Sequence, residues 1–359
     1  MQIKILHMAD VHLGRAVSGL PQSLRNIRRQ EVRSTFSDAV NLAKDENVDA
    51  VLIAGDLFDS GDTDKSTVNF IKGELSKIAH TPVFIAPGNH DPLGSAYNML
   101  INEDIKNLTV FGENVSCVKF PEKQFAVYGI GFNNEVVNAP LLKSIKAEDK
   151  DFVNIGVIHG EMGVNSDYNP ITEADIGETN MDYIALGHVH TYSGIKKSMA
   201  TSYAYCGNLE GGGFDECGEK GVILGTVSKG DCDLKLHRLC KRVYHTIEID
   251  VTDTKTLQEI IEKVKENVRC KDDLYKIVLT GKRPENIPEG VIENEIDVFF
   301  AKTKDLTRGA YDLKAISADY SIGGIFAKNV LQRMENADEN EKAELMKAAD
   351  IVMDILQNN

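Results

Sequence analysis

Several features that mark secreted or membrane proteins are missing from this sequence. Its six cysteines include no CxxC pair, which argues against a disulfide framework or a zinc ribbon and is typical of reduced cytosolic thiols. No apolar run approaches the length of a membrane span, and Met1 is followed at once by a strand pattern instead of a signal peptide. We therefore expect a cytoplasmic protein with no membrane partner.

Basic residues are also in deficit. Forty Lys and Arg stand against 55 Asp and Glu, which gives a formal net charge of −15. Such a charge argues against a protein that wraps nucleic acid over its whole surface, although it is compatible with a local basic patch. Part of the negative charge is carboxylate that bound cations would neutralise. The 359 residues are enough for two domains, and 42% hydrophobic content is that of an ordinary globular protein.

Strand and helix patterns alternate in the first part of the chain. Apolar runs over 3–6, 49–53 and 83–85 predict strands, and helical spacing over 24–46 and 65–78 predicts helices between them. A strand–helix–strand–helix order of this kind predicts a layered α/β core.

Beyond residue 91 the predicted strands become short and are divided by glycine and polar residues, which is typical of a second, more antiparallel sheet. We therefore expect an α/β (α+β) fold in which residues 1–240 form a two-sheet sandwich flanked by helices. The pattern then restarts, with strands predicted at 243–251, 274–280 and 291–300 and a helix at 255–268. This predicts a smaller C-terminal α+β domain over 241–320, followed by helices over 321–359.

Polar side chains follow five of the predicted strands, directly where each strand ends. In chain order they are Asp10 and His12, then Asp56, then Asn89 with His90 and Asp91, then His159, and finally His188 with His190. Because ligands of α/β proteins bind at the carboxyl ends of the strands, we expect these side chains to share one metal site.

The expected ligands divide into two groups around a bridge. Asp10, His12 and His190 would bind one ion, and Asn89, His159 and His188 would bind the other. Asp56 would be the carboxylate that bridges the two ions and reduces their repulsion. This mixture of nitrogen and oxygen donors suits Mn²⁺ or Fe²⁺, with Mg²⁺ as an alternative, better than a structural Zn²⁺. A pair of such ions activates water and stabilises the oxygens of an in-line displacement.

His90 stands next to an expected ligand but is not needed as one. An imidazole there could protonate the departing oxygen of a phosphate ester, the role of a general acid. Asp91 or Asp59 could orient its ring. The competing interpretation is an ordinary loop histidine, which the flanking Asn89 and Asp91 make less attractive.

Taken together, these motifs resemble the signature of the calcineurin-like metallophosphoesterases. The motifs that carry the resemblance are Asp10-Val11-His12, Gly55-Asp56, Gly88-Asn89-His90-Asp91, His159 and Gly187-His188-Val189-His190. Their order and spacing are similar across residues 1–240. The resemblance implies a two-sheet sandwich with outer helices and two-metal hydrolysis of phosphate esters.

Within that superfamily, residues 9–14 and 55–59 are similar to the SbcD-type DNA repair exonucleases, the nuclease partners of a coiled-coil ABC ATPase. The glycine-rich residues 205–216 and 218–221 resemble the same group. Ser60 and Asp91 replace residues that a Ser/Thr protein phosphatase would need. One departure is Asp59, which stands where the eukaryotic and archaeal nucleases have a histidine, so the role of that histidine is not carried over.

The resemblance implies an Mn²⁺-dependent DNA exonuclease with an SbcC-like ATPase partner, in which residues 241–320 form a capping domain that helps to hold DNA. From their Leu, Met and Val faces we expect the C-terminal helices to dock on this ATPase; the alternative is that these faces pack on their own domain. The resemblance also implies a homodimer, for which the sequence carries no interface signature. Two alternatives stay open: a phosphodiesterase acting on a small nucleotide or other diester, and a partner-binding scaffold with a dormant metal site.

Basic side chains allow two interpretations, as a solvated surface or as phosphate contacts. On the helix predicted at 24–46 they are Arg25, Arg28, Arg29 and Arg33. In the C-terminal region they are Lys241, Arg242, Lys282, Arg283, Lys302, Lys304 and Arg308.

Overall fold

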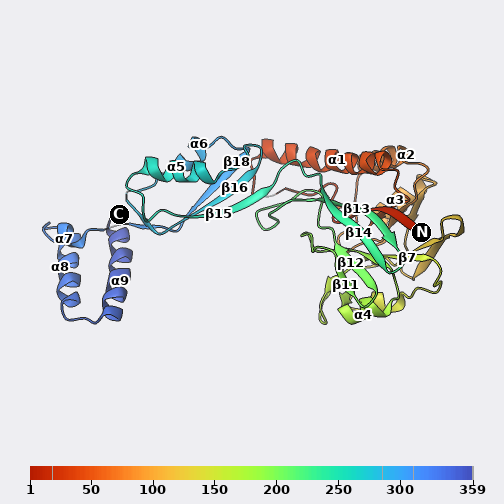
Figure 1. The fold of residues 1–359 in the computed structure, drawn as a ribbon. Coiled ribbons are helices and arrows are strands. Elements are labelled where there is room, and N and C mark those ends of the chain that lie inside the picture. Colours follow the sequence, from red (N-terminus) through yellow and green to blue (C-terminus); the bar gives the residue numbers. More distant parts are fainter. Residues whose placement is uncertain (18, 285, 310, 358–359) are drawn as a thin grey trace. The chain divides into compact units, whose positions relative to one another are not determined.

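The computed structural model describes residues 1–17, 19–284, 286–309 and 311–357, and these divide into two compact units, Met1–Val243 and Tyr244–Asn359 (Figure 1). None of the described helices is both long enough and apolar enough to cross a membrane.

The first unit contains two six-stranded sheets. The first sheet has the order β14 (Asp231–Arg238), β13 (Gly221–Ser228), β1 (Gln2–Met8), β2 (Ala50–Ile53), β3 (Val83–Ile85) and β4 (Leu108–Val110). The second has the order β11 (Lys196–Ser198), β12 (Thr201–Tyr205), β10 (Tyr183–Gly187), β7 (Val153–His159), β6 (Phe125–Gly129) and β5 (Ser116–Phe120). Strands β1 to β4 are parallel to one another, as are β6, β7, β10 and β12.

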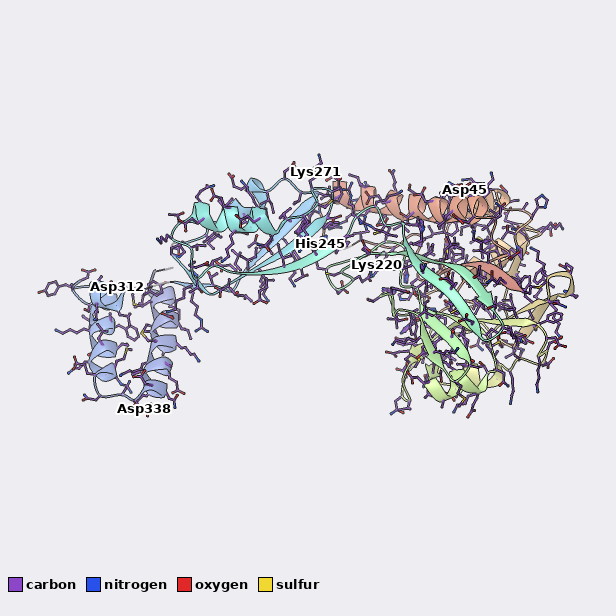
Figure 2. All side chains as sticks on the ribbon, viewed as in Figure 1. Asp45, Lys220, His245, Lys271, Asp312 and Asp338 are labelled. Atoms are coloured by element: carbon purple, nitrogen blue, oxygen red, sulfur yellow. The ribbon has the colours of Figure 1, made fainter. Side chains whose placement is uncertain are left out.

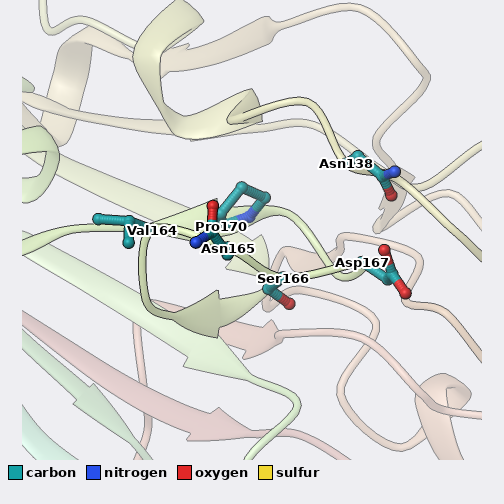
Figure 3. A pocket seen from close by; sticks show the side chains of 6 residues that line it. All are labelled: Asn138, Val164, Asn165, Ser166, Asp167 and Pro170. Atoms are coloured by element: carbon teal, nitrogen blue, oxygen red, sulfur yellow. The ribbon is translucent and has the colours of Figure 1, made fainter.

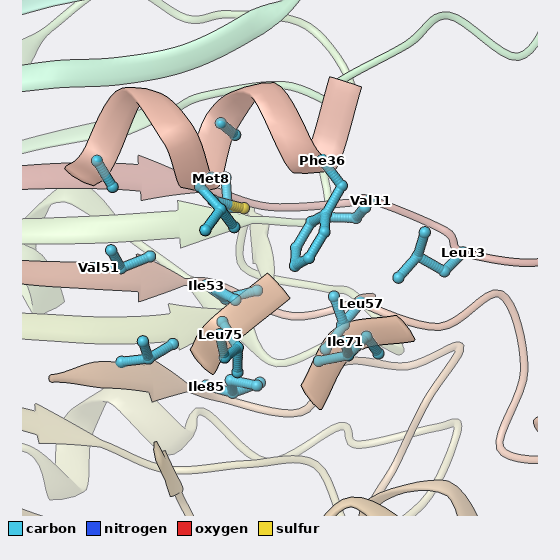
Figure 4. Close-up of a cluster of buried hydrophobic side chains, with 14 of the residues drawn as sticks. Met8, Val11, Leu13, Phe36, Val51, Ile53, Leu57, Ile71, Leu75 and Ile85 are labelled. Atoms are coloured by element: carbon cyan, nitrogen blue, oxygen red, sulfur yellow. The ribbon is translucent and has the colours of Figure 1, made fainter. Parts of the chain in front are cut away.

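Side chains that alternate along β1 build both layers of the core around the first sheet. Ile3 and Ile5 pack in a cluster shared with β7 and β10 of the second sheet, so the two sheets form a sandwich. Leu6 and Met8 point the other way, toward α1 (Gln22–Asp45), α2 (Lys65–Ser76) and α3 (Ser95–Asn102). Figure 4 shows this second layer, in which Phe36 from α1 lies among strand side chains.

The outer face of the second sheet is covered by shorter elements. These are α4 (Glu173–Glu178) and the 3₁₀ turn η2 (Leu141–Ser144), with a second 3₁₀ turn η1 (Pro121–Lys123) and the small strands β8 (Glu161–Met162) and β9 (Pro170–Ile171) elsewhere in the unit. Helix α4 begins with a capping box, because Thr172 and Asp175 each accept a hydrogen bond from the other's backbone N–H. The predicted two-sheet sandwich flanked by helices is therefore confirmed.

The second unit has a parallel sheet and a helical hairpin, each with its own core. The sheet has the order β15 (Tyr244–Asp250), β16 (Leu274–Thr280) and β18 (Phe300–Asp305), packed against α5 (Leu257–Asn267) and α6 (Val291–Glu295). After β17 (Lys282–Arg283) and β19 (Arg308–Gly309) come α7 (Leu313–Ile316), α8 (Ile322–Met334) and α9 (Glu339–Gln357). Figure 2 labels Asp312, directly before α7, and Asp338, directly before α9. The division of this region at residue 321 stays a prediction.

One expected strand in this unit is wrong. Residues 291–295 form α6, and the strand begins only at Phe300. Gly290 has a φ of 76° and starts the helix, and Ile292 and Ile296 are buried together against α5 at helical spacing. An apolar run of this length does not distinguish a short helix from a strand until its packing partners are known.

A buried histidine joins the two sheets of the sandwich. His7 on β1 has no exposed surface, and its Nδ1 lies 2.9 Å from the hydroxyl of Tyr183 on β10. Burial lowers the pKa of His7 to about 3, so the ring is neutral in the folded chain.

This buried ring makes the stability depend on pH. Below the ordinary histidine pKa of 6.5, the unfolded chain takes up a proton on His7 that the folded chain does not bind, so stability is lost as the pH falls. We predict that the free energy of unfolding of the wild type decreases relative to that of His7→Gln by about 2 kcal/mol between pH 7 and pH 5. Urea titrations at both pH values measure this, with the exposed His80→Gln as control. Parallel profiles for wild type and His7→Gln would contradict the prediction.

Candidate metal centre

The predicted ligands come from strand ends of both sheets and lie together at one edge of the sandwich. Asp10 and His12 follow β1, Asp56 follows β2, Asn89 follows β3, and His188 and His190 follow β10, while His159 is the last residue of β7. Direct contacts join the two sheets here: His12 Nε2 lies 3.2 Å from His190 Nε2, and the Asp10 carboxylate accepts a hydrogen bond from the His188 N–H at 3.0 Å.

The backbone at these strand ends has an unusual conformation. Asp10 and His12 have φ values of 51°, Asp56 has 50° and His188 has 106°. Non-glycine residues rarely adopt this region, and each instance costs on the order of 1–3 kcal/mol. Four such residues at one site indicate that the surrounding fold holds them there, as is typical of functional sites.

Two groups of donors follow the predicted division. In the first, ligand atoms of Asp10, His12 and His190 lie within 4.8 Å of one another. In the second, Asn89 Oδ1 lies 2.9 Å from His159 Nε2 and 3.0 Å from His188 Nδ1.

Asp56 lies between these groups, where a bridging carboxylate is expected. Its Oδ2 is 3.8 Å from His12 Nε2 and 3.5 Å from His159 Nε2. Burial alone would raise the pKa of Asp56, but His159 and His12 bring it below its ordinary value. Burial raises the pKa of Asp10, the other carboxylate of the site.

The chemistry of the donors fits a cation. His159 Nδ1 must donate to the carbonyl oxygen of Ala54 at 2.9 Å, so in the neutral ring Nε2 turns a lone pair toward the amide oxygen of Asn89. Two acceptors that face each other in this way repel unless a cation lies between them. Burial and the neighbouring His159 lower the pKa of His188 to about 4, so this ring is also neutral near pH 7 and able to bind a metal.

His90 is exposed at the rim of this cluster. The backbone N–H of His90 donates to Asp56 Oδ1 at 3.0 Å, and the ring atom Nδ1 lies 3.3 Å from the carbonyl oxygen of Asp59. The ring meets that of His12 edge-on, with centroids 4.7 Å apart. A ligand atom of His90 also lies within 4.8 Å of ligand atoms of His12 and Asp56, so the geometry permits His90 as a ligand as well as the predicted general acid.

The two carboxylates expected to orient His90 have different surroundings. The Asp59 side chain lies 3.2 Å from His12 Nδ1, while only its backbone oxygen meets His90. Asp91 is fully buried and accepts hydrogen bonds from the N–H groups of Asp56, Phe58 and Gly88 and from the hydroxyl of Tyr97. Asp91 therefore ties the β2 loop to the β3 loop, and its predicted effect on His90 stays a prediction. Burial raises the pKa of Asp91 to about 7.

Sequence reasoning missed the carboxylate that holds His190. Glu216 is buried, and its Oε1 lies 2.8 Å from His190 Nδ1 and 2.8 Å from Arg15 Nη2. Burial alone would raise the pKa of Glu216, but the hydrogen bonds from His190 and Arg15 lower it far below its ordinary value. Glu216 ends the glycine-rich stretch 205–216, so the resemblance marked the segment without indicating which residue reaches the site.

A similar supporting contact holds His159. Asn169, at a φ of 49°, donates from Nδ2 to the carbonyl oxygen of His159 at 2.7 Å. The loop before Asn169 also places the centroid of the Tyr168 ring 4.9 Å from the centroid of the His188 ring.

Beside this loop is a pocket of about 390 Å³, which Figure 3 shows with its lining residues Asn138, Val164, Asn165, Ser166, Asp167 and Pro170.

The arginines of α1 are not a uniform surface. Arg28 is buried, and its Nη2 donates to Glu210 Oε2 at 2.9 Å, so it does not lie on a phosphate-contacting rim. Arg25 donates to the carbonyl oxygen of Leu20, and Arg33 donates to Thr67 Oγ1. Arg29 is exposed.

The calcineurin-like phosphoesterase family model matches residues 3–192, more than half of the chain, and the chain belongs to this family. It is therefore placed among the metal-dependent phosphoesterase hydrolases, whose family uses two divalent metal ions.

Individual relatives are distant but cover most of the chain. The uncharacterized metallophosphoesterase YhaO of Bacillus subtilis (strain 168) is 25% identical over 333 residues, which are 87% of this chain and 81% of that protein. The DNA double-strand break repair protein Mre11 of Sulfurisphaera tokodaii is 26% identical, with 82% of this chain and 76% of that protein covered. Mre11 of Saccharolobus solfataricus is 27% identical, with coverages of 76% and 71%.

Removal of the Asp91 carboxylate distinguishes its structural role between the β2 and β3 loops from its predicted effect on His90. We predict that Asp91→Ala lowers the free energy of unfolding by about 3 kcal/mol, because buried N–H groups lose their acceptor. Denaturant unfolding of the metal-free protein measures this, and the exposed Asp233→Ala serves as the control that changes little. Unchanged stability together with lost hydrolysis would contradict the structural role and favour an effect on His90.

Proposed function

We propose that this protein is an Mn²⁺-dependent DNA repair exonuclease that hydrolyses phosphodiester bonds. The observation that carries the proposal is the two-part donor cluster bridged by Asp56, with the exposed His90 at its rim. Similarity to proteins named for DNA double-strand break repair, across about three quarters of the chain or more, supports DNA as the substrate.

In this proposal each predicted ligand keeps its place. Asp10, His12 and His190 would hold the first ion, and Asn89, His159 and His188 would hold the second. Asp56 would be shared between them. When bound, the ions supply Lewis-acid stabilisation for in-line attack of water on phosphorus. Nitrogen and oxygen donors without thiolate favour Mn²⁺ over a structural zinc site.

His90 acts on the leaving group. Its ring Nδ1 donates to the carbonyl oxygen of Asp59, and its backbone N–H donates to the Asp56 carboxylate. These two contacts give the ring a defined direction. In the protonated ring Nε2 carries the second proton. As the bond from phosphorus to the leaving oxygen breaks, this proton passes to that oxygen, and His90 becomes neutral.

Exposed basic side chains of the second unit provide phosphate contacts. Lys302 and Lys304 on β18 and Arg308 on β19 are exposed, and we assign the DNA contact to them. Among the other candidates, Arg283 is buried against Thr307, and ion pairs join Arg242 to Glu31, Lys241 to Asp38 and Lys282 to Asp350. Binding through phosphate contacts should weaken steeply with salt.

The C-terminal hairpin provides a docking surface for a coiled-coil ABC ATPase. Large apolar side chains are exposed at the start of α8 and the end of α9: Ile322 (75%), Ile325 (61%), Ile351 (50%) and Ile355 (57%). Because α8 and α9 form a hairpin, these ends lie at the same end of the helix pair (Figure 1). Exposed apolar clusters of this kind are typical of protein interfaces. The homodimer and the cytoplasmic location stay predictions.

Cleavage of end-labelled DNA tests the catalytic proposal. We predict degradation that requires Mn²⁺ and is abolished by EDTA and by Asp56→Asn. In His90→Ala we expect bound Mn²⁺ to be retained, by calorimetry, while turnover decreases by roughly 10²–10⁴-fold. The matched control is His80→Ala, at an exposed histidine after α2.

Two outcomes would change the assignment. Loss of metal from His90→Ala would make His90 a ligand. Cleavage of bis-p-nitrophenyl phosphate or a mononucleotide diester with no cleavage of DNA would instead indicate a small-molecule phosphodiesterase, or a nuclease inactive without its ATPase. Binding without any hydrolysis would indicate a dormant scaffold.

The docking proposal is tested separately. We predict that Ile322→Ser together with Ile325→Ser removes most binding to the ATPase in a pull-down, because the apolar contact area is lost, and that DNA cleavage by the isolated chain is unaffected. Lys328→Ser, an exposed change on α8, is the control. Unchanged capture by the double variant would contradict the proposed surface.

A further inference from the structure

We propose that Glu216 is a positioning residue for the metal site, which determines the ring nitrogen that His190 presents to the bound ion. This inference rests on the proposed metal-binding role of His190 and extends it to a second layer of the site.

The carboxylate of Glu216 is surrounded by donors. Oε1 meets His190 Nδ1 and Arg15 Nη2, each at 2.8 Å. Oε2 accepts from Asn208 Nδ2 and from the N–H of Gly212, each at 2.6 Å, and from Arg15 Nη1 at 3.2 Å. Because all of these groups donate to it, the Glu216 carboxylate is ionised. It can therefore accept a hydrogen bond from His190 but cannot donate one.

This contact decides the tautomer of His190. An ionised carboxylate can meet Nδ1 only if that nitrogen carries the proton, so in the neutral ring Nε2 keeps its lone pair. Nε2 is the atom directed into the site, 3.2 Å from His12 Nε2 and 4.0 Å from Asp10 Oδ1. In the neutral ring the lone pair is therefore directed into the site.

The chain around Glu216 holds it in a single position. Asn208 and Gly212 belong to the same loop as Glu216, and a Cβ at Gly212 would overlap the Arg15 guanidinium, so a side chain there would displace Arg15. Lys220 is buried and donates from Nζ to the carbonyl oxygen of His190 at 2.6 Å, which fixes the backbone of the same histidine. Figure 2 labels Lys220.

Loss of such an outer partner usually weakens a metal site without removing it. Carboxylates that accept from metal-bound histidines typically contribute 10- to 100-fold in metal affinity. In Glu216→Gln the amide can turn its NH₂ group toward His190 Nδ1, which favours the tautomer with the proton on Nε2 and blocks the nitrogen that faces the ion.

The experiment uses the full chain and two readouts. Calorimetric titration with Mn²⁺ alone is expected to show about 10- to 100-fold weaker binding for Glu216→Gln than for the wild type. Nitrogen-15 NMR of the metal-free protein, taken at an alkaline pH where the His190 ring is neutral, is expected to show the ring proton on Nδ1 in the wild type and on Nε2 to a large extent in the variant. Glu219→Gln is the matched control, since Glu219 is exposed and pairs with Arg238 at 3.4 Å.

Unchanged Mn²⁺ affinity and an unchanged His190 tautomer in Glu216→Gln would overturn the inference. Absence of Mn²⁺ binding by the wild type would refute the proposed function, whereas the NMR readout would still test the effect of Glu216 on the ring. Should circular dichroism show that Glu216→Gln is unfolded, Glu216→Asp replaces it. That variant keeps the charge beside Arg15 but moves the carboxylate about one methylene away from His190 Nδ1. Mn²⁺ binding is then expected to weaken, and unchanged affinity would overturn the inference.

Discussion

The site depends on one geometric constraint, the convergence of parallel strand ends from two packed sheets. β1, β2 and β3 of one sheet and β7 and β10 of the other terminate at the same edge, because the shared apolar core between the sheets holds them in that register. Each ligand segment leaves its strand abruptly, and Asp10, Asp56 and His188 do so with positive φ. The stability of the sandwich is thus used to hold backbone conformations that the isolated segments would avoid.

The second feature of the site is its concentration of buried charged and titratable side chains. Two buried carboxylates, Asp10 and Asp56, lie among imidazoles whose nitrogens face one another, an arrangement that favours a bound cation. Around them, other buried acids are fully engaged by donors: Asp91 by loop N–H groups and Tyr97, and Glu216 by Arg15 and His190. The acids within the candidate metal site and the acids behind it therefore differ in their hydrogen-bond partners, although their side chains are chemically alike.

Much of the fold was predictable because strand and helix periods are strong in the first unit and because each strand end carries polar residues. The predictions were weakest where packing decides. Residues 291–295 are apolar enough for a strand, yet Gly290 and the burial of Ile292 and Ile296 against α5 select a helix. Arg28 belongs to an arginine-rich helix face, but Glu210, far away in the chain, draws it into the interior. In both cases the contact that decides the structure is made by a residue distant in sequence, which a local sequence pattern does not reveal.

By itself, the sequence determined the family, the two-sheet architecture and the residue types that collect at the strand ends, because these follow from local periodicity and from motifs at short spacing. Only the tertiary structure decided what each side chain contacts. It turned Asp91 toward the loops behind the site, left His90 exposed beside His12, and brought Glu216 to His190 from another loop. The direction of a buried side chain is set by the hydrogen-bond partners that the whole fold brings within reach, and those partners are distant in sequence.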